Sequence, residues 1–250
     1  MDYSQIPVKV VHLNTVDSTN NYIAKLVQMN NVDSGTVVLA DFQTAGRGQR
    51  GTNWQSVSGE NMIASLYVEW TTLDLAHQFR ISMYVALGIC KFLRAHNVEA
   101  MIKWPNDILV HSKKICGVLI ENQSRGNLIS SSVIGIGLNV NQLDFPDGIN
   151  GISLSNLTGK SENVKFVALQ LFQCIGEVIQ QYQHYSFEWL AKSYCGFLYG
   201  FEAYVKAWEV NENQELVFKI TGVTPMGLLQ IETAEGKSRL LDLKEVHFVL

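Results

Sequence analysis

The sequence predicts an α+β fold, with a mixed, mainly antiparallel sheet and flanking helices, followed by a small C-terminal β domain. Apolar strand-like runs alternate with hairpin-like turns through much of the chain. Two long segments instead carry apolar residues at helical spacing. After about residue 195 only short strand-like segments follow. We therefore expect two domains, at residues 1–195 and 196–250.

The first domain is expected to begin with a strand and a helix. Apolar residues recur at helical spacing after Asp17, and Ser18 or Thr19 is suited to be the N-cap. Longer helices are expected at 74–96 and 162–182, where the same spacing continues for several turns. Strands are expected at 8–13, 36–42, 62–70, 100–103, 107–110, 115–122 and 128–140.

The second domain is expected to consist of short strands joined by tight turns. Turn-forming residues occur at Asn211-Glu212-Asn213, Pro225-Met226-Gly227 and Glu235-Gly236. The strands between them are expected at 203–210, 214–222, 226–233 and 237–249. Short strands spaced this closely are typical of a small β-barrel.

The composition is that of a soluble globular protein without a basic field that would attract nucleic acid or membranes. The chain has 250 residues, of which 47% are hydrophobic and 17% charged, and its net charge is −4. We see no apolar run of transmembrane length and no secretory signal at the N-terminus. The cysteines lack C-x-x-C spacing, so we expect reduced thiols and a cytoplasmic location. The scattered histidines argue against a dedicated metal site.

The stretch Gly46–Gly51 reads Gly-Arg-Gly-Gln-Arg-Gly and is suited to hold an anion. Its glycines let backbone N–H groups approach a ligand closely, and Arg47 and Arg50 add forked donors for carboxylate or phosphate. The spacing also matches the G-x-G-x-x-G dinucleotide fingerprint, which requires a helix that opens at the last glycine. Residues 52–59 are instead typical of a loop, so the dinucleotide interpretation is disfavoured.

Lys103-Trp104-Pro105-Asn106-Asp107 combines the end of a strand with a fixed bend. Pro105 lacks an N–H and biases Trp104 toward extended geometry, and Asn106-Asp107 is a turn-forming pair. Lys103 would then lie at the end of a strand, where its ammonium group could be directed at a ligand. The alternative is a solvated surface lysine beside a structural corner.

Gly135 and Gly137 lie two residues apart in an apolar strand and therefore share one face of it. Glycines inside a strand often mark close approach by a ligand, although tight sheet packing is an equal alternative. The N-terminus of the helix that follows Asp17 would complete a pocket for an anion beside the glycine loop.

Taken in order, these segments resemble the biotin protein ligase family. The matching motifs are Asp17–Asn20, Gln43–Gly51 with Trp54, Lys103–Asp107, Lys114–Leu119 and Gly135–Asn139. They occupy roughly residues 10–142, and their common order makes the resemblance specific. One position departs from the family pattern, which often reads Gly-Arg-Gly-Arg: the fourth place here is Gln49.

The resemblance implies the fold of biotin and lipoate ligases, which is similar to class II aminoacyl-tRNA synthetases, with an SH3-like C-terminal domain. It implies an enzyme that forms biotinyl-5′-AMP from biotin and ATP with Mg²⁺, and then transfers biotin to a lysine of a biotin carboxyl carrier domain. Arg47 and Lys103 would be the catalytic cations, and no residue is assigned to a metal. The residues that the resemblance assigns to ligand binding are Ser18, Thr19, Asn20, Gln43, Gly46, Arg47, Gly48, Gln49, Arg50, Gly51, Trp54, Lys103, Asn106, Lys114, Gly117, Gly135, Gly137 and Asn139.

Two other interpretations remain open from the sequence. A lipoate ligase shares the fold and the adenylation chemistry, and a catalytically silent protein that binds biotin or nucleotide is the alternative outside enzymes. The glycine loop and the Lys103–Asp107 motif favour biotin. Only about ten residues precede the first expected strand, so we expect a monofunctional ligase without a helix-turn-helix domain and without sequence-specific DNA binding.

Overall fold

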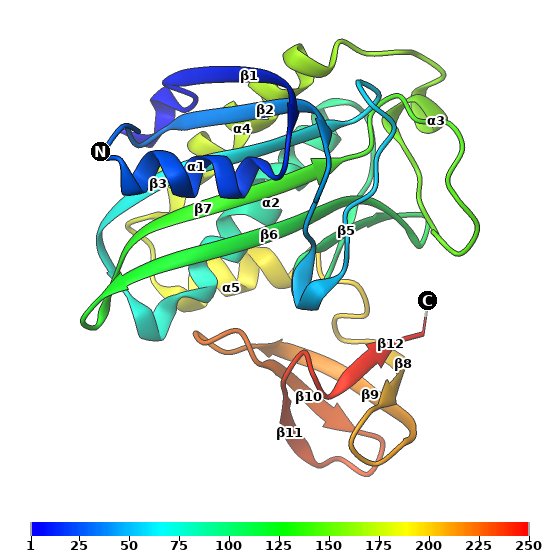
Figure 1. Cartoon of the computed structure of the whole chain (residues 1–250). Helices are drawn as coiled ribbons and strands as arrows, with labels where there is room; N and C mark the ends of the chain where they lie inside the picture. Colours follow the sequence, from blue (N-terminus) through cyan, green and yellow to red (C-terminus); the bar gives the residue numbers. More distant parts are fainter. Residues whose placement is uncertain (1, 250) are drawn as a thin grey trace.

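A seven-stranded mixed sheet forms the centre of the first domain in the computed structural model, which describes residues 2–249 except for the side chain of Arg50 (Figure 1). The strands are β1 (Lys9–Val16), β2 (Thr36–Gln43), β3 (Met62–Asp74), β4 (Met101–Lys103), β5 (Asp107–Val110), β6 (Lys113–Arg125) and β7 (Leu128–Leu138). Their order is β1-β2-β3-β7-β6-β5-β4. Only the β1–β2 pair among these neighbours is parallel, so the expected mixed, mainly antiparallel sheet is confirmed.

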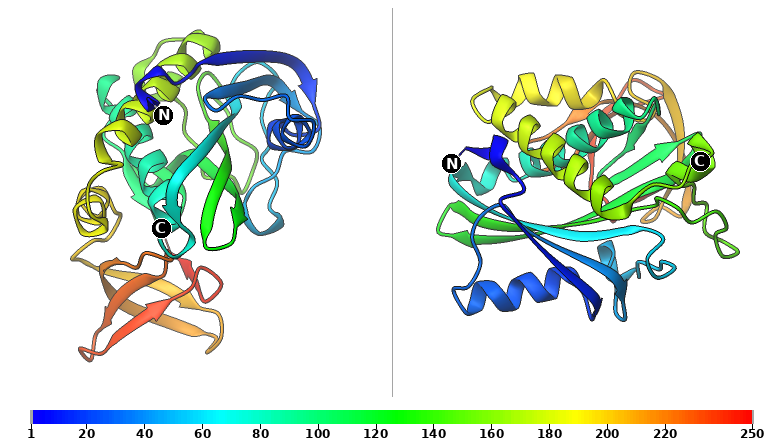
Figure 2. Two further views of the ribbon diagram at one scale, coloured as in Figure 1. Left: turned by 90° about the vertical axis from the view of Figure 1, so that its left-hand side faces the viewer. Right: turned by 90° about the horizontal axis from the view of Figure 1, so that it is seen from above.

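Helices cover both faces of this sheet (Figure 2). They are α1 (Thr19–Gln28), α2 (Phe79–Ala95), α3 (Leu154–Thr158), α4 (Val164–Tyr182) and α5 (Phe187–Cys195). On one face, Ile23 of α1 packs in a small buried cluster with Val38, Tyr67 and Val133. The larger core lies on the other face, against α2 and α4. Because both faces are covered, the central strands are nearly continuous apolar runs.

A second, antiparallel sheet follows the last helix. Its strands are β8 (Tyr204–Glu209), β9 (Gln214–Val223), β10 (Leu229–Thr233), β11 (Ser238–Leu241) and β12 (Val246–Phe248), in the order β11-β10-β9-β8-β12. The turn between β9 and β10 contacts the first domain, where the indole Nε1 of Trp104 donates a 2.9 Å hydrogen bond to the carbonyl of Gly227. Next to it, the backbone N–H of Phe79 donates to the carbonyl of Pro225. The bend after Lys103 is therefore fixed against the second sheet.

Several expected boundaries were wrong for local reasons. The helix expected at 74–96 begins only at Phe79, because Asp74 ends β3 and its side chain accepts from the N–H of Ala76 to cap a short 3₁₀ turn. The strand expected at 237–249 is split into β11 and β12 by a turn in which the Glu245 N–H donates to the carbonyl of Asp242. The short helices α3 and α5 were not expected. None of the helices within residues 2–249 is both long and apolar enough to span a bilayer.

Candidate active site

A cavity of about 370 Å³ opens on the α1 face of the sheet. Its wall combines the N-terminus of α1, the loop after β2, the ends of β4 and β5, the middle of β6 and β7, and two residues of the second domain. The predicted site residues that line it are Ser18, Thr19, Asn20, Gln43, Arg47, Gly48, Gln49, Trp54, Lys103, Asn106, Lys114, Gly117, Gly135 and Gly137. Residues from motifs that lie far apart in the sequence thus meet in one cavity.

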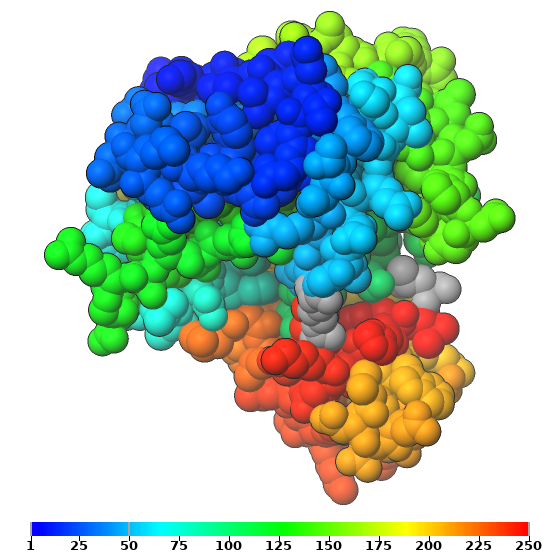
Figure 3. All heavy atoms as spheres, viewed as in Figure 1, coloured from blue at the N-terminus to red at the C-terminus, as the bar shows by residue number. Residues whose placement is uncertain are grey.

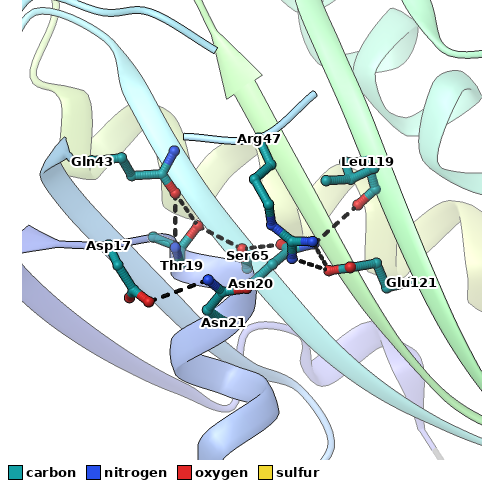
Figure 4. A network of polar contacts seen from close by, with 9 residues as sticks. All are labelled: Asp17, Thr19, Asn20, Asn21, Gln43, Arg47, Ser65, Leu119 and Glu121. Atoms are coloured by element: carbon teal, nitrogen blue, oxygen red, sulfur yellow. Dashed lines mark hydrogen bonds and ion pairs between the residues drawn. The ribbon is translucent and has the colours of Figure 1, made fainter. Parts of the chain in front are cut away.

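The N-terminus of α1 is capped from outside the helix (Figure 4). Gln43 Oε1, at the end of β2, accepts hydrogen bonds from the Thr19 N–H at 2.7 Å and from the Thr19 hydroxyl at 3.1 Å. Ser18 occupies the N-cap position, but its side chain makes no capping bond. Because Gln43 does the capping, the Ser18 hydroxyl on the cavity wall is not committed to the helix.

A buried hydroxyl on β3 joins this cap to the sheet. Ser65 Oγ lies 2.6 Å from Thr19 Oγ1 and 2.5 Å from Asn20 Oδ1, and all three residues are buried. Buried polar groups in such networks are held in one arrangement, since losing a partner costs the desolvation of the other. The sequence reasoning missed Ser65. The available signal was a polar residue within the otherwise apolar first half of β3, residues 62–68.

Glu121 of β6 connects α1 with the glycine loop. Its Oε2 accepts hydrogen bonds from Arg47 Nη2 at 2.8 Å and from Asn20 Nδ2 at 2.7 Å (Figure 4). The Arg47–Glu121 pair therefore ties the loop to the sheet, although both side chains remain about 40% exposed. Glu121 was also missed. The sequence signal for Glu121 was the alternation of side chains along a strand. It places Glu121 on the same face of β6 as Gly117 and Leu119, two residues of the cavity wall.

The second cationic group comes from the bend after β4. Lys103 is half-buried on the cavity wall, which contradicts the alternative of a solvated surface lysine. Burial lowers the pKa of Lys103, with Asp107 acting in the opposite direction and Lys114 adding to the decrease. Lys114 Nζ itself lies 2.7 Å from Asp107 Oδ1. The bend is rigid, because Asn106 Nδ2 donates to the carbonyl of Val118 at 2.7 Å.

Gly117 of β6 and Gly135 and Gly137 of β7 form the glycine floor of the cavity, against which other side chains pack. A Cβ added at Gly135 would lie 2.5 Å from Asn20 Oδ1, and one added at Gly137 would clash with the ring of Trp54. The Trp54 indole N–H is buried and has no hydrogen-bond partner among the described residues. The glycines therefore create the expected space, but the Trp54 ring occupies part of it.

Trp54 also separates the cavity from a neighbouring one of about 230 Å³. Asn139 lines this second cavity, and its Nδ2 donates to the carbonyls of Lys114 and Ile152 at 3.1 and 3.0 Å. Lys114 lines both cavities, with its ammonium 5.8 Å from the centre of the Trp54 ring. Trp54 and Lys114 are thus shared by the walls of both cavities.

The remaining predicted residues lie in the loop. Gly46 packs under Gln43 and Trp54, and Gly51 adopts a φ of +77° in a three-residue 3₁₀ turn. No α-helix opens at Gly51, which contradicts the dinucleotide fingerprint. The prediction for the Arg50 side chain lies outside the described part of the structure.

Comparisons with known proteins agree with this geometry. The family model of the biotin/lipoate A/B protein ligase family matches residues 13–139. The bifunctional ligase/repressor BirA of Bacillus subtilis is 30% identical over 92% of this chain and 71% of its own length. A biotin–[acetyl-CoA-carboxylase] ligase of Paracoccus denitrificans is 33% identical over 50% of this chain and 51% of its own.

Among solved structures, the biotin protein ligase of Aquifex aeolicus in complex with biotin and ATP superimposes with a TM-score of 0.78 at 26% identity. The match covers 96% of this chain and 98% of the Aquifex chain, so it includes the second sheet as well as the first. The family model alone spans the glycine loop, the bend after Lys103 and the glycine floor. By sequence, fold and site, this chain belongs to the biotin/lipoate A/B protein ligase family.

Proposed function

We propose that the protein is an ATP-dependent biotin protein ligase. It forms biotinyl-5′-AMP and pyrophosphate from biotin and ATP, and then transfers biotin to a lysine of a biotin carboxyl carrier domain. The observation that carries the proposal is one cavity in which the cations Arg47 and Lys103 share a wall with Gly135 and Gly137. Family membership and the likeness to a ligase solved with biotin and ATP support it.

The charges of the cavity suit the first half-reaction. The carboxylate of biotin attacks the α-phosphorus of ATP, and the bond to the leaving pyrophosphate breaks. Both partners are anions, so positive charge must bring them together and stabilise the transition state. Arg47 provides it from the glycine loop, Lys103 from β4 and Lys114 from β6. No protein nucleophile is required, because ATP itself activates the carboxylate.

The uncharged part of the cavity suits the bicyclic ring of biotin. The ureido group has two donors and one acceptor, and Ser18, Thr19 and Gln43 offer matching groups at the N-terminus of α1. The ring and its thioether would lie against the sheet beside Gly135 and Gly137, where the Trp54 ring now occupies part of the space and would have to move. The adenylate would extend past Trp54 into the cavity that Asn139 lines, with the indole ring as a stacking surface.

Magnesium would enter with the phosphates of ATP. The described residues contain no cluster of three or more histidine, cysteine, aspartate or glutamate side chains that could hold a metal ion by itself. Asp107 is the carboxylate on the cavity wall, and it is paired with Lys114. A single carboxylate fits an ion that is held mainly by substrate phosphates. When bound, the ion neutralises phosphate charge.

The same proposal covers the domain organisation and the setting. The catalytic domain would extend over residues 1–195, and the antiparallel sheet of residues 196–250 would be an SH3-like barrel. The hydrogen bonds from Trp104 to Gly227 and from Phe79 to Pro225 support a second domain that acts together with the first. We place the reaction in the cytoplasm, a reducing compartment that suits the four free cysteines.

The function is tested by incubating the purified protein with biotin, ATP, Mg²⁺ and an isolated carrier domain. Mass spectrometry should show one added biotin on a single lysine of the carrier domain. A parallel reaction with lipoate and a lipoyl domain should leave that domain unmodified. Modification with lipoate alone would assign the protein to the other branch of the family.

Exchange of Gln49 is expected to change how long the adenylate stays bound. The Gln49 carbonyl accepts from the N–H and the hydroxyl of Thr52 at 3.1 and 2.7 Å, so the backbone is fixed and a substitution alters mainly the side chain. Gln49→Arg adds a cation at the cavity wall and should slow release of biotinyl-5′-AMP about tenfold. Gln49→Gly should accelerate it. Stopped-flow fluorescence of Trp54 measures both rates, and equal rates in all three proteins would exclude a role of this position.

Glu121→Gln is expected to release the adenylate about twofold to fivefold faster, because Arg47 loses its charged partner and the loop loses an anchor. The effect is small since exposed ion pairs contribute only about 0–1 kcal/mol. Glu215→Gln is the matched control, as it breaks the exposed Lys206–Glu215 pair in the second domain. Release rates from both variants are compared with wild type. An unchanged or slower rate in Glu121→Gln would contradict the anchoring role.

A further inference from the structure

The second domain contributes two residues, Leu243 and His247, to the wall of the active-site cavity. His247 lies in the middle of β12, the strand drawn in red on the side of the second domain that faces the first (Figures 1 and 3). Its neighbours Val246 and Phe248 point into the core of the second sheet, where Val246 is 2% exposed and Phe248 packs against Phe218 at 6.1 Å. Alternation along the strand therefore directs His247 to the opposite side, toward the cavity.

The position of His247 is held on two sides. Within its own sheet it pairs with Trp208 of β8. Between the domains, the hydrogen bond from Trp104 to Gly227 fixes the second sheet to the same bend that positions Lys103. The histidine and Lys103 therefore line the same cavity from two domains that contact each other at the bend.

His247 differs from the other ionisable groups around the cavity in having a free acceptor. The charged groups on the described cavity wall are Arg47, Lys103, Asp107 and Lys114. Strand β8 and the turn before β12 add Lys206, Glu209, Asp242, Lys244 and Glu245. The arginine and the lysines are donors when charged, and the carboxylate of Asp107 is engaged by Lys114 at 2.7 Å. The His247 ring makes no hydrogen bond to another residue within the described chain. A neutral imidazole there keeps one nitrogen lone pair available.

The second half-reaction needs such an acceptor. The lysine nitrogen of the carrier domain attacks the acyl carbon of biotinyl-5′-AMP, a C–N bond forms, and the bond from that carbon to the phosphate oxygen breaks. AMP leaves with the electron pair of that bond. As the C–N bond forms, the nitrogen becomes acidic and must release a proton to a base.

We propose that His247 is the general base of the transfer step, taking the proton that the attacking lysine nitrogen releases as its bond to biotin forms. The inference rests on the proposed ligase function and adds a catalytic residue from the second domain. It also gives the second domain a role in the transfer step. The first half-reaction has no such requirement, because the attack of a carboxylate on ATP releases no proton that a base would have to accept. The first domain would then activate biotin, and both domains would transfer it.

The test separates the two half-reactions in the full-length protein. Wild type, His247→Gln and His247→Ala are first loaded with biotin and ATP, and the adenylate is quantified. Carrier domain is then added, and transfer is followed in a single turnover. We expect adenylate to form in all three proteins and transfer at pH 8 to fall about a hundredfold in both variants, the lower end of general base contributions. Imidazole in the buffer should restore transfer in His247→Ala and leave wild type unaffected.

A second histidine provides the matched control. His184→Gln, an exposed histidine after α4, is the matched control and should transfer as wild type does.

Three results would overturn the inference. Transfer within twofold of wild type in His247→Gln would remove the histidine from the step. An equal loss of adenylate formation and transfer would indicate a structural role instead. A rate loss in His247→Ala that imidazole does not restore would exclude proton transfer. Failure of the proposed function itself is recognised separately, because wild type would then form no adenylate from biotin.

Discussion

Replacing Lys103 with alanine is expected to slow formation of biotinyl-5′-AMP by tenfold to a hundredfold or more while the fold is retained. Charge-assisted hydrogen bonds contribute about 1.5–3 kcal/mol, which corresponds to this range of rates. Burial lowers the pKa of Lys103, so its ammonium is poorly solvated before a ligand arrives. A bound carboxylate or phosphate accepts hydrogen bonds from this ammonium in place of water, which stabilises the complex. The alanine variant lacks this stabilisation.

The sign of the pKa shift also predicts the effect on stability. A lysine whose folded-state pKa is lowered destabilises the fold while it is charged. This penalty disappears as the pH rises from the lowered folded-state pKa to the ordinary pKa of lysine. At neutral pH, Lys103→Ala should therefore not reduce the melting temperature through loss of the charge. Lys113→Ala is the matched control, since Lys113 is an exposed lysine at the start of β6 outside the cavity lining. Adenylate formation in Lys103→Ala within twofold of this control would remove Lys103 from the mechanism.

Gly135→Ala is expected to weaken biotin binding by about tenfold to a hundredfold. The new methyl group would lie 2.5 Å from Asn20 Oδ1, and Asn20 is held by Ser65 on one side and Glu121 on the other. Asn20 must shift, which leaves buried polar groups without partners at a cost of about 1–3 kcal/mol. The methyl group also projects into the cavity on the face where the ring of biotin is proposed to lie.

Gly222→Ala is a suitable control for this substitution. Gly222 is also a strand glycine, and its added methyl would lie 2.6 Å from Gln230 Oε1, but in the second sheet away from the cavity lining. Calorimetric titration with biotin and a melting curve for each variant separate binding from stability. Equal biotin affinity in Gly135→Ala and wild type would show that the glycine floor does not limit the ligand.

Most of the fold was predictable because its signals are local. Hairpin turns and apolar runs located the strands, and the spacing after Asn163 located α4. The start of α2 was misplaced because Asp74 can serve either as a helix cap or as the end of a strand, and only pairing of Asp74 with Leu128 of β7 decides between them. The parallel pairing of β1 with β2 was not predicted either, since it depends on how α1 packs across the sheet.

The site was predictable where its residues are close in sequence. The glycine loop and the bend after Lys103 can be recognised from their amino-acid composition, and both line one cavity in the structure. Glu121 was missed because its role depends on Arg47, which lies far away in the chain but 2.8 Å away in space. His247 was missed for the same reason, as it reaches the cavity only through the docking of the second sheet.

The central claim, that this cavity activates biotin with ATP, is tested most directly by exchange of labelled pyrophosphate into ATP. The reaction contains the protein, ATP, Mg²⁺ and either biotin, lipoate or no acid, with Lys103→Ala measured beside wild type. The account predicts exchange that requires biotin, is absent with lipoate and falls by at least tenfold in Lys103→Ala. No biotin-dependent exchange in wild type, or exchange only with lipoate, would contradict it.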